Sequence, residues 1–255
     1  MTIERSSGGG DLRLTLKLLW GKPERPNRGP KPALSLDQIV EAAVKIADTD
    51  GLGALSMRRV ATALDVGTMS LYRYVPGKAE LLDLMLDRVC DPGDTAERVE
   101  ALDWREMLEV VARGTWSLYL AHPWLLQVNW ARPVLGPNSL AGVEIVQRGL
   151  LGTGLSDQER VMVMFVLDGF VTGAARGYLN ARRAGETGVL SDDEYWAAQG
   201  PALEQALLSG DYPTLAAMSE DSFAFGQEQA FEFGLNRLLD GIDSFITNRR
   251  TAGHQ

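Results

Sequence analysis

Hydrophobic residues recur every three or four positions along most of this chain, which is the spacing that places them on one face of an α-helix. The first clear run follows Ser35, whose hydroxyl suits a helix N-cap, with Gln38 at the reciprocal capping-box position. Gly51 ends the run. The predicted inward positions of this helix are Leu36, Ile39, Val40, Ala43, Ile46 and Ala47.

Three shorter helices are predicted to follow. Ser56 caps the first of them, the second runs from about Thr68 to Val75, and Lys78 opens the third after a Pro-Gly break. The turn cluster Asp91–Asp94 marks a boundary, so residues 35–90 form a small domain of their own.

Residues 98–250 are predicted to form five or six longer helices. Proline and glycine clusters interrupt the helical pattern near residues 122–123, 132–138, 152–154, 185–201 and 210–213. No segment reads as a convincing β-sheet. The predicted fold class is therefore all-α, with a small N-terminal domain and a larger C-terminal one.

Residues 1–34 are predicted to be a flexible basic arm. Leucines alternate with polar residues from Leu12 to Leu18, a weak strand-like pattern, and the stretch from Lys22 to Pro32 carries four prolines, which resist helix formation. Two interpretations stay open: a solvated tail, or an arm that lies along DNA, for example in the minor groove.

Charge and composition narrow the classes of function. The net charge is -9, but residues 1–90 carry +2 and residues 91–255 carry -11, which suits a small anion-binding module on an acidic body. The chain has one cysteine and two histidines, so it cannot form an internal disulfide and has few side chains for a metal site or a catalytic triad. Without a membrane span or a signal peptide in the pattern, we expect a cytoplasmic protein that needs no cofactor and contacts no membrane.

The segment from Ser56 to Lys78 predicts a helix-turn-helix. The turn Asp65–Gly67 is tight, and Val66 supplies an apolar plug between the two helices. Leu71 and Val75 share one face of the second helix because they are four residues apart, and that face must be buried. The outward positions of the same helix are then Met69, Ser70, Tyr72 and Arg73.

Such an outward face suits the major groove of duplex DNA. Arginine can donate to both acceptors of guanine, a hydroxyl serves several bases, and methionine can contact a thymine methyl group. Thr68 and Lys78 are placed for phosphates, and Arg58 for a phosphate or a base. The alternative is a helical hairpin whose face has no partner.

The run Leu55–Leu82 resembles the DNA-binding domain of the tetracycline-repressor (TetR/AcrR) family. The resemblance extends back through Ser35–Gly51 and rests on Val60-Ala61, Leu71-Tyr72 and the spacing from Lys78 to Leu81-Leu82. It departs from the family at Asp65, where glycine is usual, although aspartate tolerates the left-handed conformation better than most residues. The resemblance implies operator contacts at Arg58, Thr68, Ser70, Tyr72, Arg73, Tyr74 and Lys78.

The resemblance also implies that residues 98–250 bind a ligand and dimerise. Two features support a dimer: an apolar run over Val161–Val171 that continues into a stripe of glycines, and a seam on the last helix. A partner helix within the same chain is the alternative for the glycine stripe. The stripe and the seam consist of Gly169, Gly173 and Gly177, and of Phe231, Leu235, Leu238, Ile242 and Phe245.

Aromatic residues between positions 104 and 130 predict an apolar effector pocket, although ordinary core packing would account for most of them individually. A metal site is not expected. The family's founding members hold magnesium-tetracycline with histidines, but Leu126–Ala131 offers none, so tetracycline is not the expected effector. The predicted ligand-binding residues are Trp104, Trp116, Tyr119, Asn129, Trp130, Asp168 and Arg176.

The sequence therefore predicts a homodimeric repressor that a small apolar or amphipathic effector releases from a palindromic DNA operator. Two alternatives belong to other classes of protein. One is a helical adaptor that binds proteins and leaves DNA alone. The other is an all-α enzyme, for which His122 is nearly the only candidate base.

Overall fold

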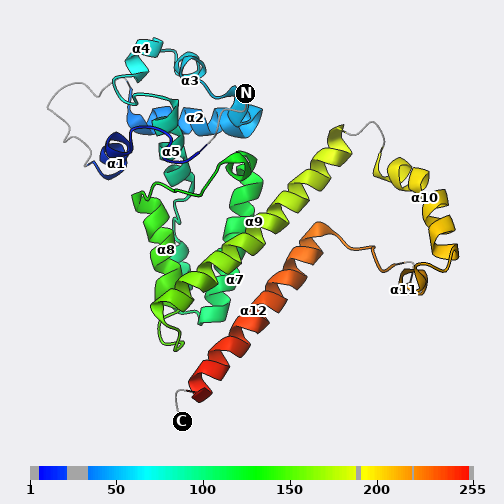
Figure 1. Cartoon of the computed structure of the whole chain (residues 1–255). Coiled ribbons are helices and arrows are strands. Elements are labelled where there is room, and N and C mark those ends of the chain that lie inside the picture. The colour runs from blue at the N-terminus through cyan, green and yellow to red at the C-terminus, as the bar shows by residue number, and fades with distance from the viewer. Residues whose placement is uncertain (1–5, 22–33, 188–190, 220, 253–255) are drawn as a thin grey trace.

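The computed structural model describes residues 6–21, 34–187, 191–219 and 221–252, and within these ranges every regular element is a helix (Figure 1). The predicted all-α class is confirmed. The elements are α1 (Leu12–Trp20), α2 (Leu36–Asp50), η1 (Leu52–Ala54), α3 (Met57–Ala63), α4 (Thr68–Leu71), α5 (Lys78–Val89), α6 (Thr95–Val99), α7 (Trp104–Ala121), η2 (Pro123–Gln127), α8 (Pro137–Gly149), α9 (Asp157–Thr187), α10 (Asp192–Leu208), α11 (Pro213–Ala216) and α12 (Gln227–Ala252).

Helices α2 to α5 form a small N-terminal domain. The predicted capping box is present, because the Gln38 amide donates to the Ser35 hydroxyl and the Ser35 amide donates to the Gln38 side chain. Gly51 ends α2 with φ at +79°, a conformation that favours glycine. The domain encloses a core of buried side chains that includes Ile39, Ala43, Val60, Leu71, Val75, Leu81 and Met85.

Helix α5 connects the two domains and is buried on nearly every side. It packs against α1, α2 and α8. Three of its carboxylates, Glu80, Asp83 and Asp87, are buried together with its leucines. A buried carboxylate is costly unless it accepts hydrogen bonds, so each of these side chains indicates a specific contact.

The N-terminal segment differs from the prediction of an extended arm. Residues Leu12–Trp20 form helix α1, and the side chain of Asp11 caps it by accepting from two amides of the first turn. Thr15 is fully buried and Leu18 packs on the core, so a helical face, not the leucine alternation, decides the conformation. The proline-rich stretch from Lys22 to Pro32 lies outside the described residues.

Helices α7, α9 and α12 form the centre of the larger domain (Figure 1). The Trp116 ring of α7 stacks on Phe231 of α12, with 4.3 Å between the ring centroids. Helix α12 comes so close to α9 at Gly234 that a Cβ there would lie 2.6 Å from the ring of Phe170. The predicted seam on α12 packs mainly within its own chain, as in a helix bundle: Phe231, Leu235 and Ile242 are buried, Leu238 is half-buried and Phe245 is exposed. Its part in a dimer stays a prediction.

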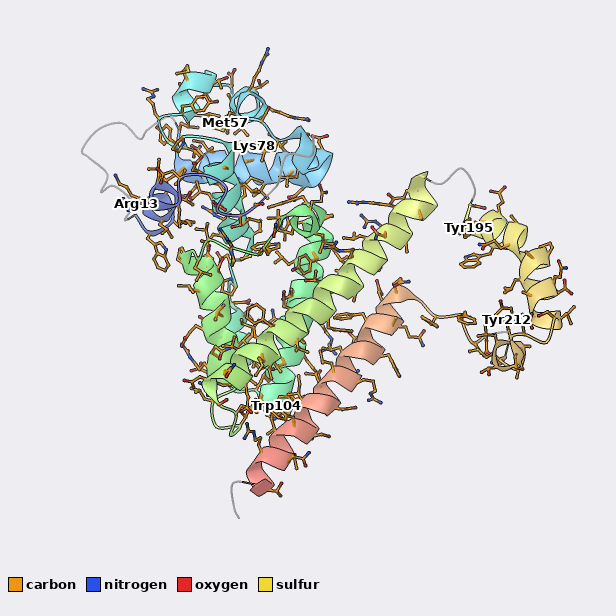
Figure 2. The ribbon with its side chains drawn as sticks, in the orientation of Figure 1. Arg13, Met57, Lys78, Trp104, Tyr195 and Tyr212 are labelled. Atoms are coloured by element: carbon orange, nitrogen blue, oxygen red, sulfur yellow. The ribbon has the colours of Figure 1, made fainter. Side chains whose placement is uncertain are left out.

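Between α9 and α12 the chain leaves this centre. Helices α10 and α11 contact each other and stand away from the rest of the larger domain (Figure 1). Tyr195 and Tyr212 lie on this excursion (Figure 2) and are about half exposed. The break predicted within residues 185–201 does not extend to its end, since α10 continues through Pro201.

Among the described residues, one helix is long and apolar enough to cross a membrane by length and composition alone, namely α9 over Asp157–Glu186. It packs against α7 and α12 and carries Asp168 and Arg176 in its middle part. Length and composition alone do not identify a membrane span, since core helices of globular domains pass the same test.

Candidate nucleic-acid interface and ligand cavity

The turn between α3 and α4 has the geometry that a helix-turn-helix requires. Asp65 adopts φ at +53°, the left-handed conformation expected for it. The Val66 amide donates to the Ala61 carbonyl at 3.0 Å, and the Val66 side chain packs against the core. The two helices are therefore held together at the end of the molecule opposite the C-terminus (Figure 1).

The outward side of α4 presents side chains that the rest of the described residues leave exposed. Leu71 and Val75 are fully buried, as their spacing predicted. Met69 is 76% exposed, Tyr72 is 44% exposed and Arg73 is exposed as well. Because methionine and tyrosine gain little from water, their exposure side by side indicates a contact surface.

Helix α4 is shorter than predicted, since it ends at Leu71 and residues 72–74 form a turn. The Tyr74 amide donates to the Leu71 carbonyl at 2.8 Å. The chain must change direction before Pro76 to enter α5, and buried Val75 anchors that turn. Tyr72 and Arg73 thus project from the turn that continues α4.

The other predicted DNA contacts surround this side. The Arg73 guanidinium donates to the Ser70 hydroxyl at 3.4 Å, a long contact. Arg59, beside Arg58, forms an ion pair with Asp50. The side chains of the remaining predicted DNA contacts all reach the surface. They are Arg58, Thr68, Tyr74 and Lys78, of which Figure 2 labels Lys78.

A cavity of about 570 Å³ opens in the larger domain. Its walls come from the end of α5, from α7, η2 and the loop after it, and from α8 and α9. Apolar side chains dominate the lining, as in most small-molecule sites. The structure brings four of the predicted ligand-binding residues to this cavity: Tyr119, Trp130, Asp168 and Arg176.

Three predicted ligand-binding residues lie elsewhere. Trp104 starts α7 beside α12, at the end far from the small domain (Figure 2). Trp116 is in the core, where it stacks on Phe231. The Asn129 side chain accepts from the Ala131 amide at 2.9 Å and so shapes its own loop. Packing and loop geometry explain these positions, which lie outside the cavity wall.

Sequence reasoning missed several smaller groups of the cavity wall. Cys90, Thr115, Ser139 and Thr172 all contribute to it. The Thr172 hydroxyl donates to the Tyr119 phenol oxygen at 3.0 Å and so orients it. A signal for Thr172 was present, because it stands one helical turn from both Asp168 and Arg176.

Burial raises the pKa of groups around the cavity. The pKa of Tyr119 rises to about 12, through burial first and the Asp168 charge second. The pKa of the Cys90 thiol rises to about 11, through burial and then the charges of Asp87 and Asp168. Loss of solvation also raises the pKa of Asp168, which lines the cavity. At neutral pH the phenol and the thiol are therefore uncharged.

Metal chemistry finds no support in the described ranges, where no three His, Cys, Asp or Glu side chains come together to hold an ion. The polar groups of the cavity are hydroxyls, one thiol, one carboxylate and one guanidinium. They suit hydrogen bonding to an organic ligand.

One side of α9 exposes apolar residues in the single chain. Val163, Leu167 and Val171 are buried, but Phe165 is 66% exposed and the neighbouring side chains Val161, Met162 and Val166 are exposed too. A Cβ added at Gly169 or Gly173 would meet open space. Among the described residues, the glycine stripe thus has no close partner at these two positions, and an exposed apolar face of this kind marks a contact surface.

Comparison with known proteins agrees with these features. Residues 39–85 match the family model described as "Bacterial regulatory proteins, tetR family". Residues 99–246 match the model "Tetracyclin repressor-like, C-terminal domain". Together the fold, the helix-turn-helix and the cavity define a ligand-responsive, DNA-binding transcriptional repressor. The chain belongs to the TetR family of regulators, which are not enzymes.

Individual relatives support the same class. The chain is 52% identical over 245 residues to the HTH-type transcriptional repressor DrrR1 of Streptomyces coeruleorubidus, covering 96% of this chain and 90% of the relative. It is 33% identical to an HTH-type transcriptional regulator of Saccharopolyspora erythraea, over 78% of this chain and 80% of that one. The crystal structure of ActR from Streptomyces coelicolor in complex with actinorhodin is 30% identical, covers 86% of this chain and 99% of its own, and has a TM-score of 0.65.

Proposed function

We propose that this protein is a homodimeric repressor that leaves a palindromic operator when a small molecule occupies the cavity of the larger domain. The outward side of α4 is the observation that carries the proposal. Met69, Tyr72 and Arg73 stand uncovered at one end of the molecule. A helix of this kind fits the major groove, where arginine donates to guanine and methionine touches thymine.

The surrounding side chains extend this surface to the DNA backbone. Thr68, Ser70 and Tyr74 offer hydroxyls, and Arg58 and Lys78 add positive charge. Contacts to phosphates fix the position of a protein on the duplex, while contacts to bases carry the specificity. In this division of roles, Arg73 and Met69 select the sequence and Lys78 contributes to affinity.

A second copy of the chain is the proposed partner of the α9 stripe. Phe165 and its apolar neighbours are exposed in the single chain, and two glycines of the stripe leave room for a helix to approach. Two-fold symmetry would present two α4 helices to successive turns of the duplex. The dimer therefore accounts for both the exposed stripe and a palindromic operator.

The proposed effector is a small apolar or amphipathic molecule. The cavity volume of about 570 Å³ suits such a ligand, and its lining is mainly apolar with a few polar groups. Tyr119, Trp130, Asp168 and Arg176 are the proposed ligand contacts. Because a 30% identical relative was solved with actinorhodin, that compound is the first one to test.

In this proposal the effector releases DNA because the cavity wall is attached to α5, so that a change in the wall reaches the DNA-binding domain. Ser139 of α8 lines the cavity and donates to Asp87 of α5, the helix that Lys78 begins. A ligand that displaces α8 would shift α5 and change the separation of the two α4 helices. The coupling between effector and operator binding is expected to be about 1–3 kcal/mol. Since a transcriptional repressor acts on DNA inside the cell, the proposed compartment is the cytoplasm.

Selection of genomic fragments by the purified protein tests this function. Recovered duplexes should bind at nanomolar to micromolar concentration at moderate salt, and actinorhodin or a compound from a screen of apolar ring systems should release them. A helical adaptor would leave every duplex unbound. Binding that no compound reverses would refute the effector and leave a constitutive repressor.

A further inference from the structure

Residues 6–21 donate hydrogen bonds to two buried carboxylates of α5. The Ser7 hydroxyl and the Gly8 amide both donate to Asp83 Oδ1, each at 2.9 Å. The amide of Asp11 donates to Glu80 Oε1 at 2.8 Å. The approach is close, because a Cβ added at Gly10 would lie 2.3 Å from the Glu80 carboxylate.

The same residues hold the loop that follows η2. The Ser7 amide donates to the Asn129 carbonyl at 3.2 Å, and the Val134 amide donates to the Ser7 hydroxyl at 3.1 Å. The Trp20 indole donates to the Leu135 carbonyl at 3.1 Å. The loop is therefore fixed near both of its ends.

We propose that Ser7 is a positioning residue that couples the ligand cavity to the DNA-binding domain, an inference that rests on the proposed function. Between the two fixed ends of the loop, Trp130 and Pro133 line the cavity. A ligand that displaces them moves Val134, and the Ser7 hydroxyl passes that displacement to Asp83 of α5.

The hydrogen bonds of the Ser7 hydroxyl connect the loop after η2 rigidly to α5. A hydroxyl donates and accepts at once, so the single oxygen of Ser7 serves both Asp83 and Val134. Both Ser7 and Asp83 are buried, at 5% and 3% exposure. Breaking either hydrogen bond would leave a buried polar group unsatisfied, which is costly, so loop and helix move together.

Asp83 depends on this segment in particular. Its other oxygen, Oδ2, is buried and has no hydrogen-bond partner among the described residues. The hydrogen bonds from Ser7 and Gly8 therefore take the place of the water that would otherwise solvate the Asp83 carboxylate. Asp83 lies one helical turn before Asp87, which holds α8, so two cavity walls are attached to the same face of α5.

Ser7 lies ahead of the tetR family match, which begins at residue 39, whereas Asp83 lies within it. The coupling through Ser7 is thus a feature of the N-terminal residues of this chain, added to the contact between α5 and α8. It gives residues 6–21 a role other than the DNA arm that the sequence allowed.

Hydrogen–deuterium exchange of the full chain tests the proposal without an identified effector, because coupling between two binding sites is reciprocal. The probe is a duplex recovered by the genomic selection. Exchange of the amides in residues 129–136 is measured with and without this duplex in the wild type, in Ser7→Ala, and in Arg13→Ala as a control on the exposed side of α1 (Figure 2).

The duplex should change the exchange rates of the loop by about fivefold or more in the wild type and the control, and by much less in Ser7→Ala at saturating duplex. An unchanged loop in the wild type, or an equal change in Ser7→Ala, would overturn the proposal. If Ser7→Ala fails to fold, Trp20→Phe removes the hydrogen bond to Leu135 from a half-exposed position and should reduce the change. Failure of every duplex to bind would instead refute the proposed function.

Discussion

The Ser139 hydroxyl donates to the Asp87 carboxylate at 3.0 Å, and the backbone amide of Ser139 donates to the same oxygen at 2.9 Å. Asp87 thereby satisfies amides at the start of α8 that have no partner within the helix. The packing is tight, since a Cβ added at Gly136 would lie 2.3 Å from this carboxylate. A wall of the cavity is thus fixed to the helix that enters the DNA-binding domain.

Replacing Asp87 should destabilise the fold. Asp87→Ala removes a buried acceptor and leaves the amides of Asn138 and Ser139 unsatisfied, so the free energy of unfolding should fall by about 1–3 kcal/mol. Urea denaturation measures it. Glu144→Ala on the exposed side of α8 is the control and should change stability by less than about 0.5 kcal/mol. Equal effects of the two substitutions would contradict the role of Asp87.

Filling the cavity should abolish the response to the effector. Gly142 lies on the cavity wall within α8, and an added Cβ there meets open space, so Gly142→Leu is expected to place a side chain in the cavity. Operator affinity should stay unchanged, whereas the effector concentration for half release should rise by about tenfold or more, equivalent to about 1.4 kcal/mol. Fluorescence anisotropy of a labelled operator reports both, and Ala141→Leu, exposed on the same helix, is the control. A normal response in Gly142→Leu would place the effector elsewhere.

A charge on the exposed stripe of α9 should separate the dimer. Phe165→Glu puts a carboxylate where a second copy is proposed to pack, and desolvating it there is unfavourable. Light scattering after size exclusion should give about 28 kDa instead of twice the chain mass of 27.8 kDa. Leu12→Glu, at a half-exposed site on α1, should remain a dimer. A dimeric Phe165→Glu protein would exclude this face as the interface.

Acid should weaken the junction of α9 and α12. Glu159 accepts from the Ser156 amide at 2.8 Å and pairs with Arg249 of α12, and these contacts lower its pKa from 4.5 to about 2. The pKa of Glu159 is lower in the folded state than in the unfolded state. Its contribution to the stability of the fold is therefore complete above the unfolded-state pKa of about 4.5, and it is lost as pH falls from about 4.5 to about 2.

Thermal melting across this range checks the effect. The melting temperature of Glu159→Gln should fall less between pH 5 and pH 2 than that of the wild type, because the variant has no carboxylate at this position to protonate. Asp243→Asn, at an exposed position of α12, should follow the wild type. Parallel curves for the wild type and Glu159→Gln would contradict the assigned contact.

The small domain could be predicted closely because local signals decide it. The caps at Ser35 and Ser56, the left-handed turn at Asp65 and the inward pair Leu71 and Val75 all follow from short-range chemistry. The end of α4 was harder to predict, since it depends on how the chain turns before α5 and not on helix periodicity.

The cavity and the N-terminal segment depend on tertiary contacts that no spacing shows. Trp116 and Trp130 are equally apolar in sequence, but Trp116 meets Phe231 in the core while Trp130 reaches the cavity. Ser7 has no periodic signal at all, and its role depends on a carboxylate that lies 76 residues away in the sequence. Charge asymmetry indicated an anion-binding module but could not distinguish a tail from a docked helix.

The central claim is that the outward side of α4 selects a DNA sequence, and titration of a recovered duplex with wild type and Arg73→Ala tests it most directly. The account predicts specific binding by the wild type and a loss of about 1–3 kcal/mol in Arg73→Ala, with weaker discrimination against a scrambled duplex. Equal affinity and equal discrimination for the two proteins would contradict it.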